Sequence, residues 1–365
     1  MVSVLGTCWK RLFPVAFFLC LSALQGCAEM SAHQHFTLGN TDMEKKLVWP
    51  PPPDVPRFIY SGELTGEANF VSDDQNQKAR SGIAVAFEWL TGLIIGEAPP
   101  VVMQRPQAGV VDEHGRIYVT DASRKAVFVF DETGGQLLVW DRAAEMTRFA
   151  GPVGIALGAN GEILVSDAEL GVVVRLGHDG APLGSFGKGI LKRPTGLARD
   201  PKQGLLYVAD TRAHDVKVFD DQGRLVNTIG HSGDLAGEMN APTHLAFAGD
   251  ELYVTDSLNS RIQIYSGNGD MLRQFGDRGL YVGNLVRPKG VAVDNEGHVY
   301  VIESYYDHLL VYDKDGALLM SIGGSGTQPG QFYLPAGIWI DRRNRVFVAD
   351  MFNGRVEVFQ FLGES

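Results

Sequence analysis

The sequence of 365 residues is poor in cysteine, with three residues that all lie within the first 27 positions. This count excludes a disulfide-stapled fold and a haem attachment motif built on two cysteines. Positive charge is also scarce, since 32 Lys and Arg face 43 Asp and Glu for a formal net charge of −11. Such a chain is poorly suited to nucleic acid or to an anionic membrane surface as its main partner.

The N-terminal segment contains an apolar run, residues 12–24, that follows two basic residues. The run is too short to span a bilayer, and its layout is that of a secretory signal. It ends in LQGC (24–27), which resembles the bacterial lipobox; an ordinary cleaved signal with an incidental cysteine is the alternative. We therefore expect a lipoprotein signal peptide in residues 1–26 and lipidation of Cys27. Acyl chains would then hold the protein in the bacterial cell envelope, at the outer membrane or the periplasmic face.

The segment after the lipobox, residues 27–53, is largely polar and ends in four consecutive prolines after Trp49. Consecutive prolines favour polyproline II, which acts as a semi-rigid spacer. We expect this segment to be a tether that holds a folded domain, residues 54–365, away from the membrane.

One pattern recurs six times in that domain, an alternation of aliphatic and aromatic residues that ends in an acid, as in IYVTD and LYVAD. Successive acids are 43 to 47 residues apart. The acids are Asp121, Asp167, Asp210, Asp256, Glu303 and Asp350. Four short apolar segments separated by turns fill each unit, which is typical of a propeller blade. The sequence therefore predicts an all-β fold, a six-bladed β-propeller of four-stranded blades.

The repeat resembles the NHL-repeat family of six-bladed β-propellers. The best matches are D-x-x-N-x-R-I from Asp256 and D-x-x-N-x-R-V from Asp350, whereas the other units keep the acid and lose the Asn and Arg. The resemblance implies that the repeated acids are architectural, and an acid at a strand end can accept backbone N–H bonds in the next turn. It also implies a role in envelope assembly or recognition.

Two segments depart from the repeat. The last unit stops after its third strand, and RFIYSG (57–62) resembles the missing fourth strand. We therefore expect Phe58–Gly62 to pair with Val356–Phe361 and to close the ring. Residues 79–96 carry apolar side chains at helical spacing. They predict a short helix that caps the propeller, with an apolar docking element for a partner as the alternative.

Function is expected at the residues that break the repeat. His244 replaces a glycine at the start of an innermost strand, near the mouth of the central channel. The other candidates lie in loops that the topology places on one rim, with solvated loop side chains as the alternative. They are Arg212, His214, His231, Tyr281, Tyr305, Tyr306, His308 and Tyr333. Because loops on a rigid scaffold often carry function, we expect a monomeric, non-enzymatic propeller whose rim binds an envelope protein or a small ligand.

A metal-dependent lyase or lactonase-like hydrolase with its site in the channel is the alternative function. Members of related six-bladed families hold zinc with several channel histidines, or calcium with Glu, Asn and Asp. Here only His244 has a channel position, and a catalytic zinc needs three protein ligands. His114, His178 and His298 are predicted in turns of the opposite face, too dispersed for a site. We therefore assign no catalytic residue and predict no cofactor, and leave a channel calcium or zinc open.

Overall fold

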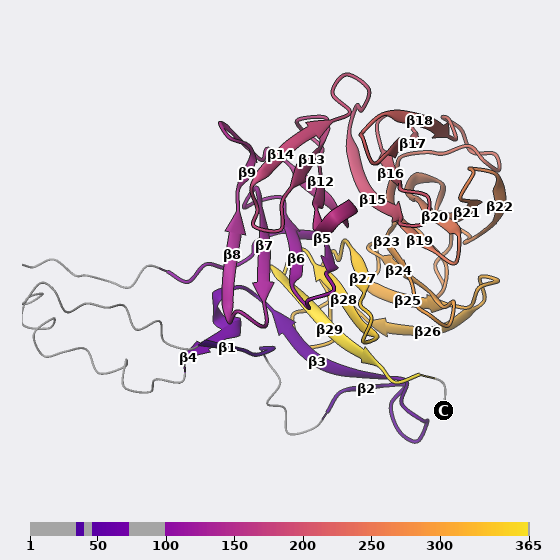
Figure 1. The fold of residues 1–365 in the computed structure, drawn as a ribbon. Coiled ribbons are helices and arrows are strands. Elements are labelled where there is room, and N and C mark those ends of the chain that lie inside the picture. The colour runs from indigo at the N-terminus through magenta and orange to yellow at the C-terminus, as the bar shows by residue number, and fades with distance from the viewer. Residues whose placement is uncertain (1–33, 40–45, 73–98, 364–365) are drawn as a thin grey trace, which may run out of the picture.

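The computed structural model describes residues 34–39, 46–72 and 99–363. Within these ranges, short strands form antiparallel sheets that stand as six blades around a common axis (Figure 1). This six-bladed β-propeller confirms the predicted fold class. The expected signal peptide, Cys27 and the insert at 79–96 lie outside the described residues. No helix in the described ranges is long and apolar enough to cross a membrane.

Each of the first five blades contains four strands, which follow one another in chain order from the axis outward. Blade 1 contains β5 (Pro106–Val111), β6 (Ile117–Asp121), β7 (Ala126–Asp131) and β8 (Gln136–Trp140). Blade 2 contains β11 (Pro152–Leu157), β12 (Ile163–Asp167), β13 (Val172–Leu176) and β14 (Pro182–Phe186). Blade 3 contains β15 (Pro194–Asp200), β16 (Leu205–Asp210), β17 (Asp215–Asp220) and β18 (Leu225–Ile229).

The remaining blades complete the ring. Blade 4 contains β19 (Pro242–Ala248), β20 (Glu251–Asp256), β21 (Arg261–Ser266) and β22 (Met271–Phe275). Blade 5 contains β23 (Pro288–Val293), β24 (Val299–Glu303), β25 (His308–Tyr312) and β26 (Leu318–Gly323). Blade 6 contains β27 (Ile338–Ile340), β28 (Arg345–Asp350), β29 (Arg355–Phe361), β3 (Phe58–Leu64) and β2 (Val48–Trp49). Two small sheets stand outside the blades, β1 (Gln34–Phe36) with β4 (Phe70–Ser72) and β9 (Arg142–Ala144) with β10 (Thr147–Arg148).

The burial of the strands explains the sequence pattern. Every residue of β6, β12 and β24 is buried, because these strands lie inside their blades and both of their faces pack against a neighbouring blade. Four of the five residues of the outermost strand β18 are exposed. Six clusters of buried apolar side chains fill the interfaces between adjacent blades. The core is therefore a ring of interfaces between blades. The second and third strands of every unit supply the apolar side chains that fill these interfaces.

The closing strand lies where the sequence predicts it. β3 pairs antiparallel with β29, from Phe58 opposite Phe361 to Leu64 opposite Val356. Phe58, Tyr60 and Leu64 are buried by this pairing. β3 thus completes the last blade and joins the two ends of the ring (Figure 1).

Part of the segment expected to be a tether differs from that expectation. β2 pairs with β3 and adds a fifth strand to blade 6. The Trp49 ring packs edge-on against Phe359 with their centroids 5.4 Å apart, and Leu47 packs against the same core. Two apolar side chains therefore anchor residues 46–49 to the domain, a contact that the polar and proline-rich composition around them does not reveal.

The buried Arg355 side chain binds the closing strand β3 to its neighbours. The Arg355 side chain lies within 2.9 Å of carboxylate oxygens of Asp350 on β28, Glu63 on β3 and Glu357 on β29. Its Nη2 also donates to the backbone carbonyl of Gln331. Burial raises the pKa of Glu357 to about 9, and the neighbouring carboxylates add to the rise while Arg355 opposes it. Arg355 therefore links three strands of the blade on which the ring closes.

Candidate functional site

The six repeat acids are fully or almost fully buried, and each accepts hydrogen bonds from the loop that enters its own blade. Asp121 shows the pattern: one carboxylate oxygen accepts from the backbone N–H groups of Gln104 and Arg105, and the other accepts from Ser123 and Arg124. One carboxylate thereby fixes both the entry loop and the following turn. These contacts involve backbone of the same blade, which is an architectural use of the acids.

Blades 4 and 6 carry the additional Asn and Arg. Asn259 donates to the Asp256 carboxylate at 2.7 Å, and Arg261 donates to it at 2.8 Å. The Arg261 guanidinium also donates to the carbonyls of Asp234, Leu235 and Glu238 in the loop between blades 3 and 4. The Asn and Arg therefore hydrogen-bond both to the acid and to the loop that joins two blades.

We call the side of the ring that carries the turns after these acids the upper face, and the opposite side the lower face. Three predicted residues, Tyr281, Tyr306 and His308, line one hollow of about 90 Å³ on the upper face. The Tyr305 and Tyr306 rings are perpendicular, with centroids 4.9 Å apart. The structure therefore brings the predicted residues of the blade 4–5 loop and of blade 5 together.

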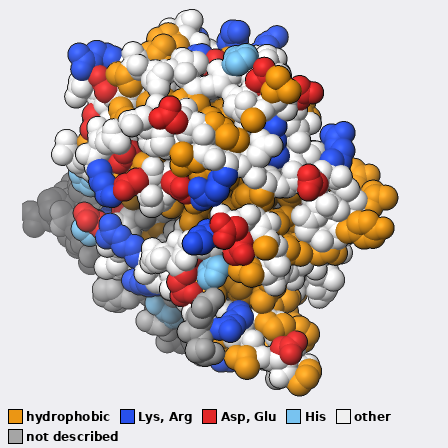
Figure 2. Space-filling model, turned by 90° about the vertical axis from the view of Figure 1, so that its right-hand side faces the viewer, with side chains coloured by type: hydrophobic (Ala, Val, Ile, Leu, Met, Phe, Trp, Pro, Cys, Tyr) orange, Lys and Arg blue, Asp and Glu red, His pale blue; other side chains and the backbone are white. Residues whose placement is uncertain are grey.

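Exposed apolar side chains surround this hollow. Leu280 and Tyr281 are each 84% exposed, and Val282 and Tyr305 are also exposed. We call Leu280, Tyr281, Val282, Tyr305 and Tyr306 the upper-face patch. A side view shows that hydrophobic side chains reach the surface of this molecule in groups, with charged side chains between them (Figure 2).

The other predicted rim residues do not join the patch. His214 accepts a hydrogen bond from the backbone N–H of Ala241 through Nδ1, at 3.1 Å, so it links blade 3 to the loop that enters blade 4. His231 lies 3.4 Å from the Glu238 carboxylate. Arg212 is exposed. Tyr333 is half-exposed and packs against Phe352, one blade further round the ring.

His244 lies in the channel, at the position that Gly196 and Gly337 occupy in blades 3 and 6. Both of its ring nitrogens are buried and have no hydrogen-bond partner among the described residues. Burial, with a smaller contribution from the Lys289 cation, lowers the pKa of His244 to about 3, so the ring is neutral at neutral pH. The hollow that it lines has a volume of about 510 Å³ and is bordered by the innermost strands of all six blades.

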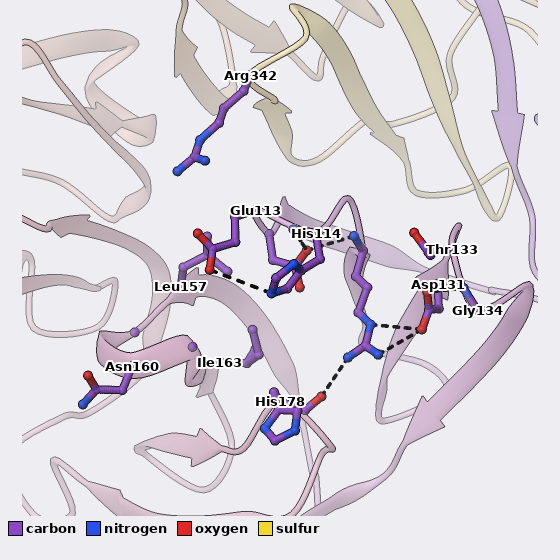
Figure 3. Close-up of a pocket in the computed structure, with 14 residues that line it drawn as sticks. Glu113, His114, Asp131, Thr133, Gly134, Leu157, Asn160, Ile163, His178 and Arg342 are labelled. Atoms are coloured by element: carbon purple, nitrogen blue, oxygen red, sulfur yellow. Dashed lines mark hydrogen bonds and ion pairs between the residues drawn. The ribbon is translucent and has the colours of Figure 1, made fainter.

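A groove of about 1070 Å³ on the lower face is a feature that the sequence prediction missed (Figure 3). His114 and His178, expected to be too dispersed for a site, both line it. The turns of blades 1 and 2 converge there, which brings these two side chains to one groove. The third histidine, His298, lies elsewhere and contacts Asp294 at 2.8 Å.

One sequence signal could have pointed to the groove. Blade 2 has Gly158 where the equivalent turns of three other blades have Asp112, Asp294 and Asp341. In those turns the carboxylate accepts backbone N–H bonds and fills the space inside the turn. Gly158 has no side chain to do this, and it lines the groove.

The described part of the chain contains no group of three His, Cys, Asp or Glu side chains close enough to hold a metal ion. His244 stands alone in the channel, whose lining includes no carboxylate. Neither the three-ligand zinc site nor the Glu, Asn and Asp calcium site considered from the sequence fits the residues that are there.

Comparison with known families agrees with this geometry. A family described as a 6-bladed beta-propeller matches residues 284–364, and the NHL repeat matches residues 191–219. This chain is an NHL-repeat six-bladed β-propeller. The matched NHL repeat spans all of β15 and β16 and all but the last residue of β17, so it covers the first three strands of blade 3.

Curated relatives match the NHL propeller over short stretches. Protein brain tumor of Drosophila melanogaster is 32% identical over 121 residues, which are 32% of this chain and 11% of the relative. The human E3 ubiquitin-protein ligase NHLRC1 is 33% identical over 86 residues, 23% of this chain and 22% of the relative. The chain thus spans a small part of the length of these relatives.

Solved structures share the fold of the NHL propeller at low identity. A streptogramin B lyase aligns with a TM-score of 0.54 and 13% identity, over 71% of this chain and 94% of that chain. An auxiliary nutrient binding protein from Bacteroides thetaiotaomicron aligns with a TM-score of 0.57 and 14% identity, over 72% of this chain and 70% of that chain. An enzyme and a binding protein thus share this architecture, and the fold alone does not decide between them.

Proposed function

We propose that the NHL propeller is a lipid-anchored scaffold of the bacterial cell envelope that binds a partner protein through its upper-face patch. The observation that carries this proposal is the exposure of three consecutive apolar residues, Leu280, Tyr281 and Val282, next to Tyr305. Exposed apolar groups of this kind mark interaction sites on soluble domains. Tyrosine is also enriched among the residues that dominate binding energy at protein interfaces.

The shape of the patch favours a protein over a small ligand. Its hollow of about 90 Å³ is well below the roughly 300 Å³ at which small-molecule pockets begin. The loop at 280–282 instead presents its side chains outward. We infer that the partner is an envelope protein with an apolar groove that accepts this loop, because a protruding apolar loop buries most area inside a concave surface.

A double substitution tests the patch. We expect Leu280→Ser with Tyr281→Ser to reduce capture of the partner at least about tenfold, since loss of one dominant contact costs about 2 kcal/mol or more. The measurement is crosslinking of the tagged full chain in intact cells, with the crosslinked bands quantified after purification. Leu183→Ser with Leu272→Ser is the matched control, because these leucines are also exposed but lie on the outer strands β14 and β22. Equal band intensities for the two double variants would refute the proposal.

The anchor is tested separately. Cys27→Ser is expected to abolish incorporation of radiolabelled palmitate and to move the protein from the membrane fraction to the soluble fraction of the envelope, because the thiol that carries the lipid is gone. Cys20→Ser keeps the cysteine of the lipobox and should label like the parent protein. A Cys27→Ser protein that still carries label would show that the lipid attachment site lies elsewhere, and a parent protein without label would show that no lipid is attached.

A further inference from the structure

No carboxylate is present among the described residues that line the channel. Its polar lining residues are Arg199, whose guanidinium is paired with Asp221 at 2.9 Å, the neutral His244, Trp339 and the exposed Arg342. The remaining lining residues are apolar or glycine. The protein as a whole has a formal net charge of −11, so a channel without a carboxylate is a local departure from its composition. An acid-free, largely apolar cavity with arginine at its mouth is suited to an apolar molecule that carries negative charge.

Buried polar atoms in the channel lack partners. Arg199 Nε, Trp339 Nε1 and both ring nitrogens of His244 are buried with no hydrogen bond among the residues that the structure describes. A buried polar group without a partner is unfavourable, and native proteins rarely keep one without a reason. Arg199 Nε and Trp339 Nε1 can only donate, and a neutral imidazole donates through one nitrogen. An oxygen acceptor inside the channel would therefore satisfy these donors.

The four polar residues are spread along the depth of the channel. Counted from the proline that opens each innermost strand, His244 comes two residues later, Trp339 four, Arg199 five and Arg342 seven. His244 thus lies near the upper end. There the strands approach closely, since a Cβ on Gly196 would lie 2.6 Å from the His244 Cα. Arg342 lies at the lower end.

The lower end of the channel opens into the groove. Leu157, Gly158 and Arg342 line both hollows. Arg342 is exposed and makes no ion pair within the described ranges, and its side chain extends toward the hollow from the blade 6 turn (Figure 3). The next residue, Arg343, instead faces Glu132 at 3.7 Å and lines neither hollow. Entry from the lower face would therefore bring a ligand past the unpaired Arg342 guanidinium, in a groove that Asp112, Glu113 and Asp131 also line.

We propose that the channel is a binding site for an apolar carboxylic acid that carries a second oxygen. The carbon skeleton lies among the aliphatic side chains, the carboxylate is held at Arg342, and the far oxygen reaches Trp339 or His244. The volume of about 510 Å³ is within the range of roughly 300 to 1,000 Å³ that small-molecule sites occupy. This site is distinct from the upper-face patch and does not depend on the proposed partner.

Three matched probes test the site by isothermal titration calorimetry on the full chain. They are 12-hydroxydodecanoate, dodecanoate, which lacks the far oxygen, and 1,12-dodecanediol, which lacks the charge. We expect 12-hydroxydodecanoate to bind one per chain, and each of the other two to bind at least about tenfold more weakly. Absence of binding, or equal affinity for the acid and the diol, would overturn the proposal.

Two neighbouring arginines supply the control. Arg342→Gln should weaken binding of 12-hydroxydodecanoate at least about tenfold and leave the affinity for the diol unchanged. Arg343→Gln, one residue away and outside both hollows, should change neither. His244→Leu should remove the advantage of 12-hydroxydodecanoate over dodecanoate. If Arg342→Gln and Arg343→Gln behave alike, the carboxylate is not held at this mouth and the proposal fails.

Discussion

Replacing Arg355 by methionine is expected to lower the free energy of unfolding by about 3–5 kcal/mol, the cost of breaking a buried ion pair from one side. Asp350 and Glu357 are inaccessible to solvent, and Glu63 is largely buried. Without the guanidinium, these carboxyl groups would face one another and two loop carbonyls would lose a donor. Equilibrium unfolding in urea measures the change.

The matched control for Arg355→Met is a surface ion pair. Arg193 lies 2.9 Å from Glu169, and both side chains are about half exposed. Arg193→Met is expected to change stability by less than about 1 kcal/mol, because water screens such pairs. If Arg355→Met were no more destabilising than Arg193→Met, the network around Arg355 would not contribute to closure of the ring.

Replacing residues 54–64 by a Gly/Ser stretch of the same length is expected to have a still larger effect. The change removes Phe58, Tyr60 and Leu64 from the core, and each large buried apolar side chain contributes about 1.5–3 kcal/mol. Their sum approaches the total stability of a typical domain, about 5–15 kcal/mol. The Gly/Ser replacement also leaves the edge of β29 unpaired, and an unpaired strand edge is a template for aggregation. We expect loss of the cooperative thermal transition, measured by circular dichroism.

The control for the closing strand keeps the backbone pairing and changes only the outward face. Ile59 and Ser61 are half-buried and alternate with the core residues of β3. Ile59→Thr with Ser61→Thr keeps residues of good strand propensity and should retain the cooperative transition. A thermal midpoint that is unchanged by the Gly/Ser replacement would show that the ring does not need this strand.

The fold was predictable because its signals are local and repeated. An acid after each buried strand, such as Asp121, bonds to backbone within 20 residues along the chain, so a single unit already contains the pattern. The partner of the closing strand was found for a related reason, since a unit that lacks its fourth strand leaves a defined gap. β2 escaped prediction because its two residues are too few to form a pattern, and Trp49 finds its core contact more than 300 residues later.

For the candidate sites, the sequence predicted only which loops lie on the same face of the ring. That placement grouped Tyr281 with Tyr306 and His308, which do share a hollow. It could not show that His214 is engaged with Ala241, because such a contact depends on side-chain geometry. The groove depends on loops of blades 1, 2 and 6, and the missing carboxylate at Gly158 becomes informative only when the neighbouring turns are in place.

The pairing of β3 with β29 also has a consequence for the order of synthesis. The ribosome makes Phe58 about 300 residues before its partner Phe361. The early strand must therefore wait until the five blades between it and β29 have emerged, since no other described strand fills its place in blade 6. Until β29 has been made β3 lacks its partner, so the sheet that seals the ring forms only after Phe361 has been added.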